Sequence, residues 1–340
     1  MARKKKNGNS AMVIAFILIC VMALVWYFTS SDNGFLSFKD NEEQQDILDD
    51  DDEIIDNQVD ELVTVDDTVN IDESDNTEDT SEELIEEVVE ELDTTFDETG
   101  FDLSVDTSIL SNETISWSWR RNEEHIPVEI YSPYSRDELA DLGAYYNVDT
   151  EEKVIYLTFD AGYENGYTES ILDTLLEYNI KAAFFVTKTY IEYNPEITIR
   201  MKDEGHIVGN HSSTHPSFPD LTDDEIAEEL DSTAETMAQL TGYDMDLFFR
   251  PPEATYSERT LYVARKLGYR TIFYSMAYVD WDRDNQPGAE VALDHVMTNY
   301  HDGCVMLLHA VSSSNAEALG DIITELQNLG YRFGYLYEVE

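Results

Sequence analysis

Five short polar motifs stand at the ends of hydrophobic segments between residues 157 and 309 of this 340-residue chain. In chain order they are Leu157-Thr158-Phe159-Asp160, His211-Ser212-Ser213-Thr214-His215, Phe249-Arg250-Pro251-Pro252, Val279-Asp280-Trp281 and Leu307-Leu308-His309. Such positions, where a strand continues into a loop, are where α/β folds collect their reactive side chains. Two acids, an arginine and three histidines together predict a hydrolytic site.

Asp160 comes immediately before a turn that contains glycine. An aspartate there can cap the turn through its carboxylate, or it can act as a general base that takes a proton from water. Arg250 favours the base, because a guanidinium beside a carboxylate lowers the carboxylate's pKa and fixes its geometry.

His211 and His215 are four residues apart in a polar segment followed by Pro216. They are either loop histidines or ligands of a divalent metal, and two neutral imidazoles at this spacing suit a metal. A bound metal would polarise a carbonyl group and bind water.

Asp280 and His309 supply a second carboxylate and a last imidazole. A lone histidine after an apolar strand is often a packed core residue. With a carboxylate to orient it, the imidazole becomes a competent general acid.

Apolar segments alternate with amphipathic ones from Lys153 onward, which predicts an α/β fold with parallel strands and right-handed crossovers. A long helix is expected from about Leu221, where Thr222 and Glu225 form a capping box. The predicted strands cover residues 154–159, 182–186, 206–209, 247–250, 270–275 and 304–308.

The order and wording of the five motifs resemble the polysaccharide deacetylase family, the NodB-type domains of carbohydrate esterase family 4, over roughly residues 116–340. Segments 158–168 and 280–286 are most similar to the sporulation-type peptidoglycan de-N-acetylases that prepare muramic acid for δ-lactam formation. The resemblance implies a distorted, incomplete (β/α) barrel of about seven strands. It also implies a hydrolase that removes acetyl groups from amino sugars of peptidoglycan, N-acetylmuramic acid in particular.

The resemblance also implies a role for each motif residue. Trp281 would form a wall of the substrate groove, Leu307 would line the pocket for the acetyl methyl group, and the N–H of Glu253 would help to hold the oxyanion. The complete assignment is catalysis by Asp160 as base, His309 as acid, Arg250 and Asp280, metal binding by His211 and His215, and substrate binding by Trp281, Leu307 and Glu253.

Two positions depart from the family pattern. Ala161 replaces the aspartate that is usually the third metal ligand, and Ala254 replaces a glycine. We therefore expect a weakly bound divalent metal, zinc first, with manganese and cobalt as alternatives. The same departures leave a glycan-binding pseudoenzyme as a rival interpretation, and a deacetylase of chitin-like or other acetylated polysaccharides as a third.

Charge divides the chain. Residues 32–119 carry 32 of the 73 acidic residues and one basic residue, Lys39, which predicts an acidic, disordered linker over 29–115 ahead of a catalytic domain over 116–340. From Arg120 onward the net charge is still −26. Nucleic acid is a poor partner for such a domain, and an uncharged cell-wall glycan is a better one.

The N-terminus combines a basic segment with an apolar one. Residues 1–10 contain Arg3-Lys4-Lys5-Lys6 and predict a cytoplasmic tail, and residues 11–28 are just long enough to cross a bilayer. A cleaved signal peptide is the competing interpretation, but the segment ends in Trp26-Tyr27-Phe28 without a cleavage signature. We expect a single-pass protein of a bacterial, Gram-positive cell membrane with its catalytic domain outside.

Overall fold

The computed structural model describes residues 99–121 and 123–339. The predicted tail, the predicted membrane segment and residues 29–98 of the predicted linker lie outside this part of the chain. Within it, no helix combines the length and the hydropathy needed to span a bilayer.

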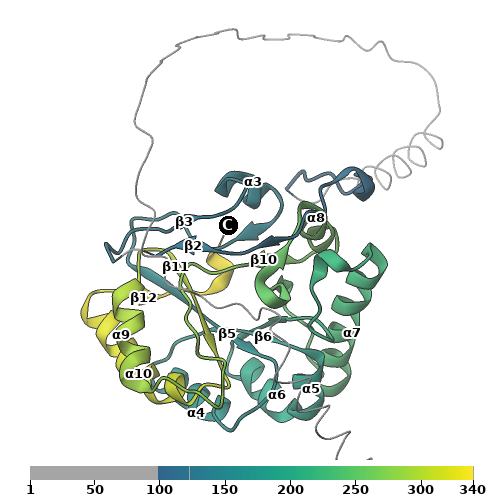
Figure 1. Ribbon diagram of the computed structural model, residues 1–340. Helices are drawn as coiled ribbons and strands as arrows, with labels where there is room; N and C mark the ends of the chain where they lie inside the picture. Colours follow the sequence, from purple (N-terminus) through teal and green to yellow (C-terminus); the bar gives the residue numbers. More distant parts are fainter. Residues whose placement is uncertain (1–98, 122, 340) are drawn as a thin grey trace, which may run out of the picture. The chain divides into compact units, whose positions relative to one another are not determined.

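From Lys153 onward, strands of the described chain are mostly separated by helices, as the sequence predicts (Figure 1). The strands are β1 (Ile115–Ser116), β2 (Trp119–Arg120), β3 (Glu129–Ile130), β4 (Ala144–Tyr145), β5 (Val154–Ala161), β6 (Ala183–Val186), β7 (Ile207–Asn210), β8 (Phe248–Phe249), β9 (Thr255–Tyr256), β10 (Arg270–Ile272), β11 (Cys304–His309) and β12 (Arg332–Phe333). The helices are α3 (Arg136–Asp141), α4 (Thr168–Glu177), α5 (Lys188–Tyr193), α6 (Pro195–Asp203), α7 (Asp223–Thr241), α8 (Glu258–Lys266), α9 (Ala289–Asn299) and α10 (Ser313–Asn328). Single 3-10 turns are η1 (Thr107–Ile109), η2 (Phe218–Asp220), η3 (Pro252–Ala254) and η4 (Leu336–Glu338).

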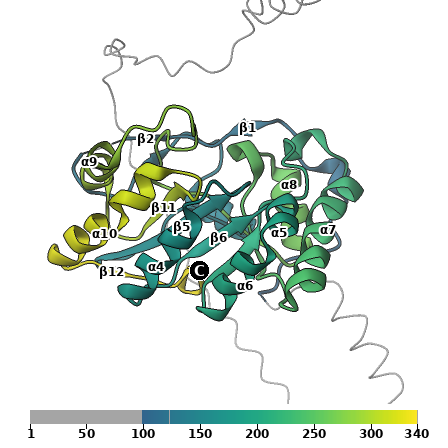
Figure 2. The ribbon, with the colours of Figure 1, turned by 90° about the horizontal axis from the view of Figure 1, so that it is seen from below.

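Seven parallel strands form the main sheet in the order β11-β5-β6-β7-β8-β10-β4, and β12 pairs with the start of β5. Helices α4, α5, α6, α7 and α10 surround the outside of this curved sheet (Figure 2). The predicted capping box is confirmed, since α7 begins after Thr222 with reciprocal bonds between Thr222 and Glu225. The α/β barrel of about seven strands is therefore present.

The two faces of β5 carry different chemistry because successive side chains of a strand alternate. Ile155, Leu157 and Phe159 belong to the apolar cluster between the sheet and the helices. Val154 and Tyr156 belong to a second cluster in the barrel interior, which Leu336 and Val339 from the C-terminal end also join. The same alternation places Thr158 and Asp160 on the interior face, beyond this apolar floor.

The ring of strands is irregular between β10 and β11. β10 is shorter than the predicted strand over 270–275, because the chain leaves the ladder after Ile272 and runs beside β11. There a single parallel bridge joins Met276 to Met306, and the Leu307 N–H donates to the Met276 carbonyl at 2.9 Å. The barrel thus closes without a full strand ladder, which is the expected distortion.

The packed domain starts earlier than the predicted boundary at residue 116. Segment 99–115, which the charge pattern assigns to the linker, lies against α8. The rings of Phe101 and Tyr262 are 5.2 Å apart, and the Val105 N–H donates to the Tyr262 hydroxyl at 3.0 Å. Charge counting missed this segment because Phe101, Val105 and Leu110 provide apolar contacts within an otherwise polar stretch.

Gly303 directly precedes β11, and its backbone lies close to the carbonyl of Val148. This close approach can be tested by substitution. Its φ is +71°, and a β-carbon there would lie 1.9 Å from the carbonyl oxygen of Val148. Gly303→Ala should lower the free energy of unfolding by about 3 kcal/mol, combining overpacking with a left-handed alanine.

Gly242 at the end of α7 is the matched control. Its φ is +76°, and a β-carbon there would meet no atom within 4 Å. Gly242→Ala should therefore cost only about 1 kcal/mol, the backbone contribution alone. Urea unfolding of both variants measures the difference, and equal losses would contradict the close approach of Val148 to Gly303.

Candidate active site

The predicted base and the predicted acid lie side by side. Asp160 on β5 and His309 on β11 are partners in the parallel register of these neighbouring strands. Both strands extend further than predicted, so each residue lies in the last positions of its strand rather than beyond it. Leu307 is buried two residues before His309 and so shares its face of β11.

Arg250 occupies the barrel interior, where only 1 % of its surface is exposed. Its Nη1 donates to Asp160 Oδ1 at 2.8 Å, and its Nη2 donates to Thr158 Oγ1 at 2.9 Å. Its Nε donates to the Ile272 carbonyl at 3.0 Å, and its guanidinium lies 4.2 Å from the centre of the Phe185 ring. Arg250 thereby ties β8 to β5 and β10.

The buried Asp160 remains ionised. Burial alone would raise the pKa of its carboxyl, but the charge of Arg250, followed by that of His309, outweighs burial and lowers that pKa below its ordinary value. Arg250 binds Oδ1, while Oδ2 lies 3.7 Å from His211 Nε2. Oδ2 is therefore the oxygen positioned to accept a proton.

His309 is oriented by Asp280, as the sequence predicts. Its Nδ1 lies 2.7 Å from Asp280 Oδ1, and its backbone N–H donates to Asp280 Oδ2 at 2.8 Å. Asn315 on α10 donates to the same Oδ2 at 2.6 Å and to the His309 carbonyl at 3.1 Å. Asn315 was missed because nothing in the local sequence links a helical amide to this pair.

The pKa of His309 moves in the direction opposite to that of Asp160. Burial would lower the pKa of the imidazole, but the charge of Asp280 and its hydrogen bond outweigh burial and raise the pKa above its usual value. Because Asp280 binds Nδ1, the proton available to a substrate is on Nε2. The site therefore combines an ionised carboxylate with a readily protonated imidazole.

Gln286 holds the loop that carries Asp280 and Trp281. Its Nε2 donates to the carbonyls of Asp280 at 2.7 Å and Asp282 at 2.9 Å, and its Oε1 accepts from the Ser312 hydroxyl at 2.6 Å. Trp281, next to the buried Asp280, is 49 % exposed.

His211 and His215 lie together in the loop after β7, with ring centres 4.9 Å apart. His211 Nδ1 is 2.8 Å from the Arg250 carbonyl, which can only accept, so Nδ1 carries the proton. Burial lowers the pKa of His211 to about 4, so the ring is neutral at pH 7. The Nε2 lone pair is thus available to a metal, and its partner carbonyl fixes the ring as metal-ligand histidines require.

Two polar residues that the motifs do not include shape this loop. Asn210 Oδ1 accepts from the Ser212 N–H at 2.8 Å. Glu229 of α7 accepts from the N–H groups of Ser213 at 2.9 Å and Thr214 at 2.8 Å. These bonds support the left-handed conformation of Ser212, with φ of 70°. Glu229 could not be recognised from sequence because it belongs to a distant helix.

A third side-chain donor is missing from the described residues. Among them, no group of three or more His, Cys, Asp or Glu side chains is arranged to hold a metal ion. Ala161 is fully buried in the outer apolar cluster. Glu164, the nearest acidic residue after Ala161 in the sequence, caps α4. It accepts from the N–H of Tyr167 at 3.0 Å and from the hydroxyl of Tyr190 at 3.1 Å. The two imidazoles fit a metal ion, but they would bind it without a carboxylate side chain as third ligand.

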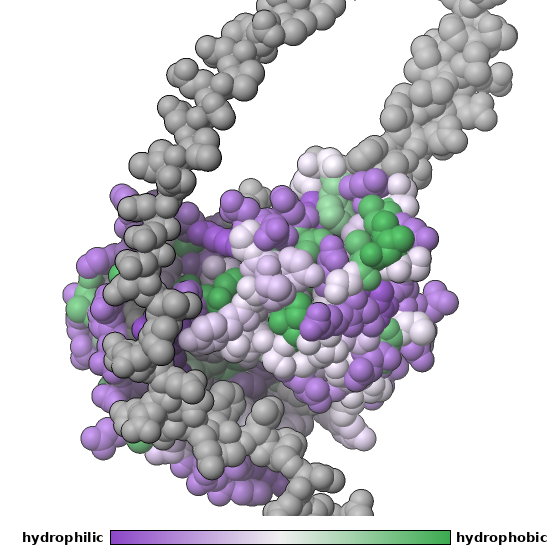
Figure 3. All heavy atoms as spheres, turned by 45° about the horizontal axis from the view of Figure 1, so that its top comes forward, coloured by the Kyte–Doolittle hydropathy of each residue, from purple (hydrophilic) through white to green (hydrophobic). Residues whose placement is uncertain are grey.

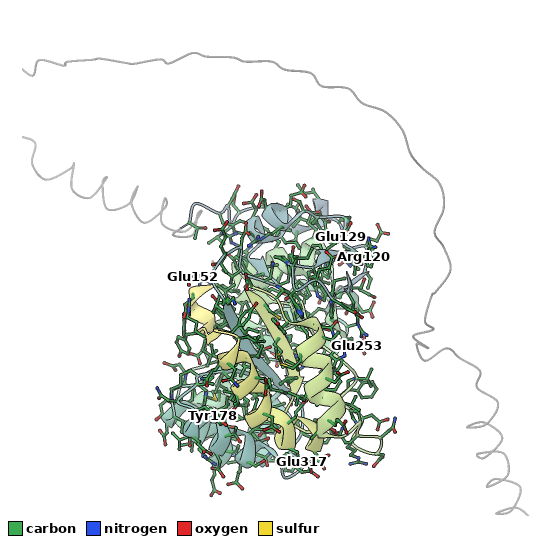
Figure 4. The ribbon with its side chains drawn as sticks, turned by 90° about the vertical axis from the view of Figure 1, so that its left-hand side faces the viewer. Arg120, Glu129, Glu152, Tyr178, Glu253 and Glu317 are labelled. Carbon is green, nitrogen blue, oxygen red and sulfur yellow. The ribbon has the colours of Figure 1, made fainter. Side chains whose placement is uncertain are left out.

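The turn after Arg250 is strained at the predicted departure from the family pattern. Glu253 and Ala254 have φ of 56° and 52°, which glycine adopts more easily than other residues. The Glu253 side chain is exposed (Figure 4), so only its backbone is placed at the turn.

Comparison with known proteins agrees with this arrangement. The polysaccharide deacetylase family model matches residues 147–272. Peptidoglycan-N-acetylmuramic acid deacetylase PdaA of Bacillus subtilis is 45 % identical over 234 residues, which cover 68 % of this chain and 87 % of that protein.

Solved structures show the same similarity. That of Bacillus subtilis PdaA, a family 4 carbohydrate esterase, has a TM-score of 0.64 and 42 % identity, covering 68 % of this chain and 98 % of that one. That of BA3943, a CE4 family pseudoenzyme from Bacillus anthracis, has a TM-score of 0.55 and 29 % identity, covering 65 % and 76 % of the two chains.

The coupling of His309 to Asp280 can be measured directly. Asp280→Asn removes the negative charge and should lower the pKa of His309, as followed by NMR titration of the imidazole. Because the pKa of His309 is higher in the folded state than in the unfolded state, its protonation stabilises the folded protein. This contribution is complete at pH values below the unfolded-state pKa of about 6.5, and it is lost as the pH rises through the folded-state pKa. The variant should therefore lose more stability in mild acid than in base.

Asp284→Asn is the control on the same loop, because Asp284 is exposed and its carboxylate lies 3.6 Å from Arg283 Nε rather than beside His309. It should leave the His309 titration unchanged. An unaltered pKa in Asp280→Asn would show that another group sets the charge of His309.

Proposed function

Because this chain belongs to the polysaccharide deacetylase family, we propose that it hydrolyses the N-acetyl groups of peptidoglycan amino sugars, N-acetylmuramic acid in particular. The observation that carries the proposal is the pair at the ends of β5 and β11. Asp160 is ionised and His309 is readily protonated, and they occupy matching register positions.

This pair supplies the two proton transfers of amide hydrolysis. Asp160 Oδ2 takes a proton from the water whose oxygen attacks the acetyl carbonyl carbon. His309 Nε2 then gives a proton to the sugar nitrogen as the carbon–nitrogen bond breaks. The products are acetate and a free amine. Arg250 keeps Asp160 ionised for the first transfer, and Asp280 keeps His309 charged for the second.

His211 and His215 would hold a divalent metal, for which two imidazoles make zinc the first choice, with manganese and cobalt as alternatives. When bound, such an ion polarises the acetyl carbonyl as a Lewis acid. The fixed tautomer of His211 supports this assignment. The absence of a donor at Ala161 supports weak binding.

The surface chemistry supports a glycan rather than a nucleic acid as partner. The domain is strongly acidic from Arg120 onward, and the face in Figure 3 is largely hydrophilic with separate apolar patches. A polymer with the charge density of nucleic acid would be repelled, whereas sugar hydroxyls can bond to such a surface. With residues 11–28 as a membrane anchor, the domain would meet the cell wall outside the membrane. We also propose that this deacetylation takes place during sporulation and prepares muramic acid for δ-lactam formation.

Two substitutions leave a glycan-binding pseudoenzyme as a second candidate. Ala161 and Ala254 both depart from the family pattern, and a pseudoenzyme of the same fold is among the similar structures. The intact pairs Asp160–Arg250 and His309–Asp280 favour the enzyme.

Acetate release from peptidoglycan tests the proposed function. Asp160→Asn and His309→Ala should each lower kcat by about 10²- to 10⁴-fold, because each removes one proton transfer. The double variant should lose less than the product of the two single losses. Mass spectrometry of the glycan identifies the deacetylated sugar. Full activity of both single variants would refute the mechanism, and a native chain that binds glycan without releasing acetate would identify the pseudoenzyme.

Metal binding has a readout that is independent of turnover. Calorimetric titration with zinc, manganese and cobalt should show weaker binding to His211→Ala and His215→Ala than to the native chain, because one imidazole with waters cannot hold the ion. His206→Ala is the control, since His206 is buried, accepts at Nδ1 from the Ala182 N–H at 3.1 Å and lies outside the loop. Equal affinity in all four proteins would remove the metal from the mechanism.

A further inference from the structure

A pocket with a volume of about 260 Å³ lies between α3 and the segment that contains β4. Arg136, Asp137 and Ala140 line it from α3, and residues 144–147 and Asp149 line it from the other side. The volume is below the roughly 300–1,000 Å³ of pockets for drug-sized ligands. The pocket therefore suits a single small ring or group rather than an oligomer.

This pocket is at the end of β11 opposite to the active site. Asn147 forms an antiparallel bridge with Cys304, the first residue of β11, whereas His309 is the last residue of that strand. At about 3.3 Å per residue, the Cα atoms of Cys304 and His309 are roughly 17 Å apart. A group bound beside Asn147 is therefore not the group on which Asp160 and His309 can act.

The side chain of Asn147 is buried without an internal partner. Only 4 % of its surface is exposed, and its Oδ1 accepts no hydrogen bond from residues 99–121 or 123–339. The backbone around it is fixed, because the bridge to Cys304 is followed by a bond from the Val148 N–H to the Gly303 carbonyl at 2.9 Å. A buried polar group without a partner costs free energy. Its presence in the lining of a pocket points to a ligand that supplies the missing bond.

The groups in this pocket are complementary to an acetamido group. The amide of Asn147 can accept from an N–H and donate to a carbonyl, and its soft terminal torsion lets either atom turn to the pocket. Arg136 Nη1 lies 3.1 Å from Asp149 Oδ2, and the other N–H groups of this guanidinium bond to no residue that the structure describes. Ala140 and Ala144 add methyl-sized apolar surface to the same lining. Together they match the N–H, the carbonyl and the methyl of the ligand.

The charge of the pocket favours a neutral ligand. Two carboxylates, Asp137 and Asp149, accompany the one guanidinium of Arg136, so the lining is net negative. Burial raises the pKa of the Tyr146 hydroxyl, and the charges of Arg136 and Asp149 act on that pKa in opposite directions. This hydroxyl is therefore uncharged beside the ion pair and can bond to a sugar hydroxyl. A stem peptide, or the lactyl group of muramic acid, carries carboxylates that such a lining repels.

We propose that this pocket binds the acetamido group of a neutral N-acetylated amino sugar, so that the domain holds the glycan at a second site where no deacetylation occurs. The inference rests on the proposed function for the class of polymer, and it goes beyond that function because the second site needs no turnover. Binding here keeps the domain on the glycan while the active site exchanges substrates.

Methyl NMR distinguishes this pocket from the active site. In the full chain carrying Asp160→Asn and isotope-labelled alanine methyl groups, N-acetylglucosamine should shift the Ala140 and Ala144 signals in a saturable manner. Glucosamine and glucose, which lack the acetyl group, should leave both signals in place. The imidazole signals of His309 report binding at the active site separately.

Two variants test the lining. Asn147→Leu replaces the amide by an alkyl group of similar size and should weaken N-acetylglucosamine binding about five- to thirtyfold, the effect of two hydrogen bonds. Ala140→Leu fills the pocket from α3, where Ala140 is half-buried, and should abolish the Ala144 shift without changing β4. Asn328→Leu is the matched control, because Asn328 is exposed on α10 and does not line the pocket. It should retain the native affinity.

Retention on the glycan gives a second readout. The Asp160→Asn chain should sediment with glycan strands freed of stem peptides, and adding Ala140→Leu should lower the bound fraction. In the chain that retains Asp160, Ala140→Leu should leave acetate release from a soluble disaccharide within about twofold of native, because distant sites act independently. If the native chain releases no acetate while the alanine signals still shift, only the proposed function fails.

Three results would overturn the second site. Unchanged Ala140 and Ala144 signals over the whole titration would show that the pocket holds only water. Equal shifts with glucosamine would show that the acetyl group is not recognised. A larger response to a stem peptide than to the sugar would assign the pocket to the peptide.

Discussion

The site depends on one buried cation. Arg250 has almost no exposed surface, and leaving a guanidinium unpaired there would cost several kcal/mol. Asp160, Thr158 and the Ile272 carbonyl take its donors, so the positions of three strands are fixed by one side chain. The carbonyl of the same residue faces His211 Nδ1. A single residue therefore positions the candidate base with its side chain and the candidate metal ligand with its backbone.

The two carboxylates of the site show how environment divides their roles. Asp160 faces a permanent cation at Oδ1, and its Oδ2 accepts no hydrogen bond from the residues that the structure describes. Asp280 has its oxygens occupied by the His309 ring, the His309 N–H and Asn315. The first can accept a proton from a substrate water, whereas the second can only stabilise charge on its neighbour. Sequence position alone does not distinguish these roles, but the hydrogen-bond partners do.

The sequence predicted the strands, the α/β class and the clustering of the motifs, because these follow from alternating hydrophobicity and from strand ends meeting at one edge. It could not predict Asn315, Gln286 or Glu229. These residues act through contacts between distant segments, and asparagine, glutamine and glutamate on helices or loops are ordinarily solvent-facing. It also placed the domain boundary too late, since a few apolar residues after residue 98 are enough to bind α8 despite the surrounding acidity.

The irregular closure of the barrel has a consequence for the site. If β10 continued along its ladder, the following loop would begin one strand away from β11. Instead the chain crosses over, and Met276 already pairs with β11. Asp280 then lies four residues further on and reaches His309 at the end of that strand. The carbonyl of Tyr274 at the crossing accepts from the indole N–H of Trp117 at 2.8 Å, so the segment around Trp117 is held against the crossing. The distortion is thus what brings the orienting carboxylate to the candidate acid.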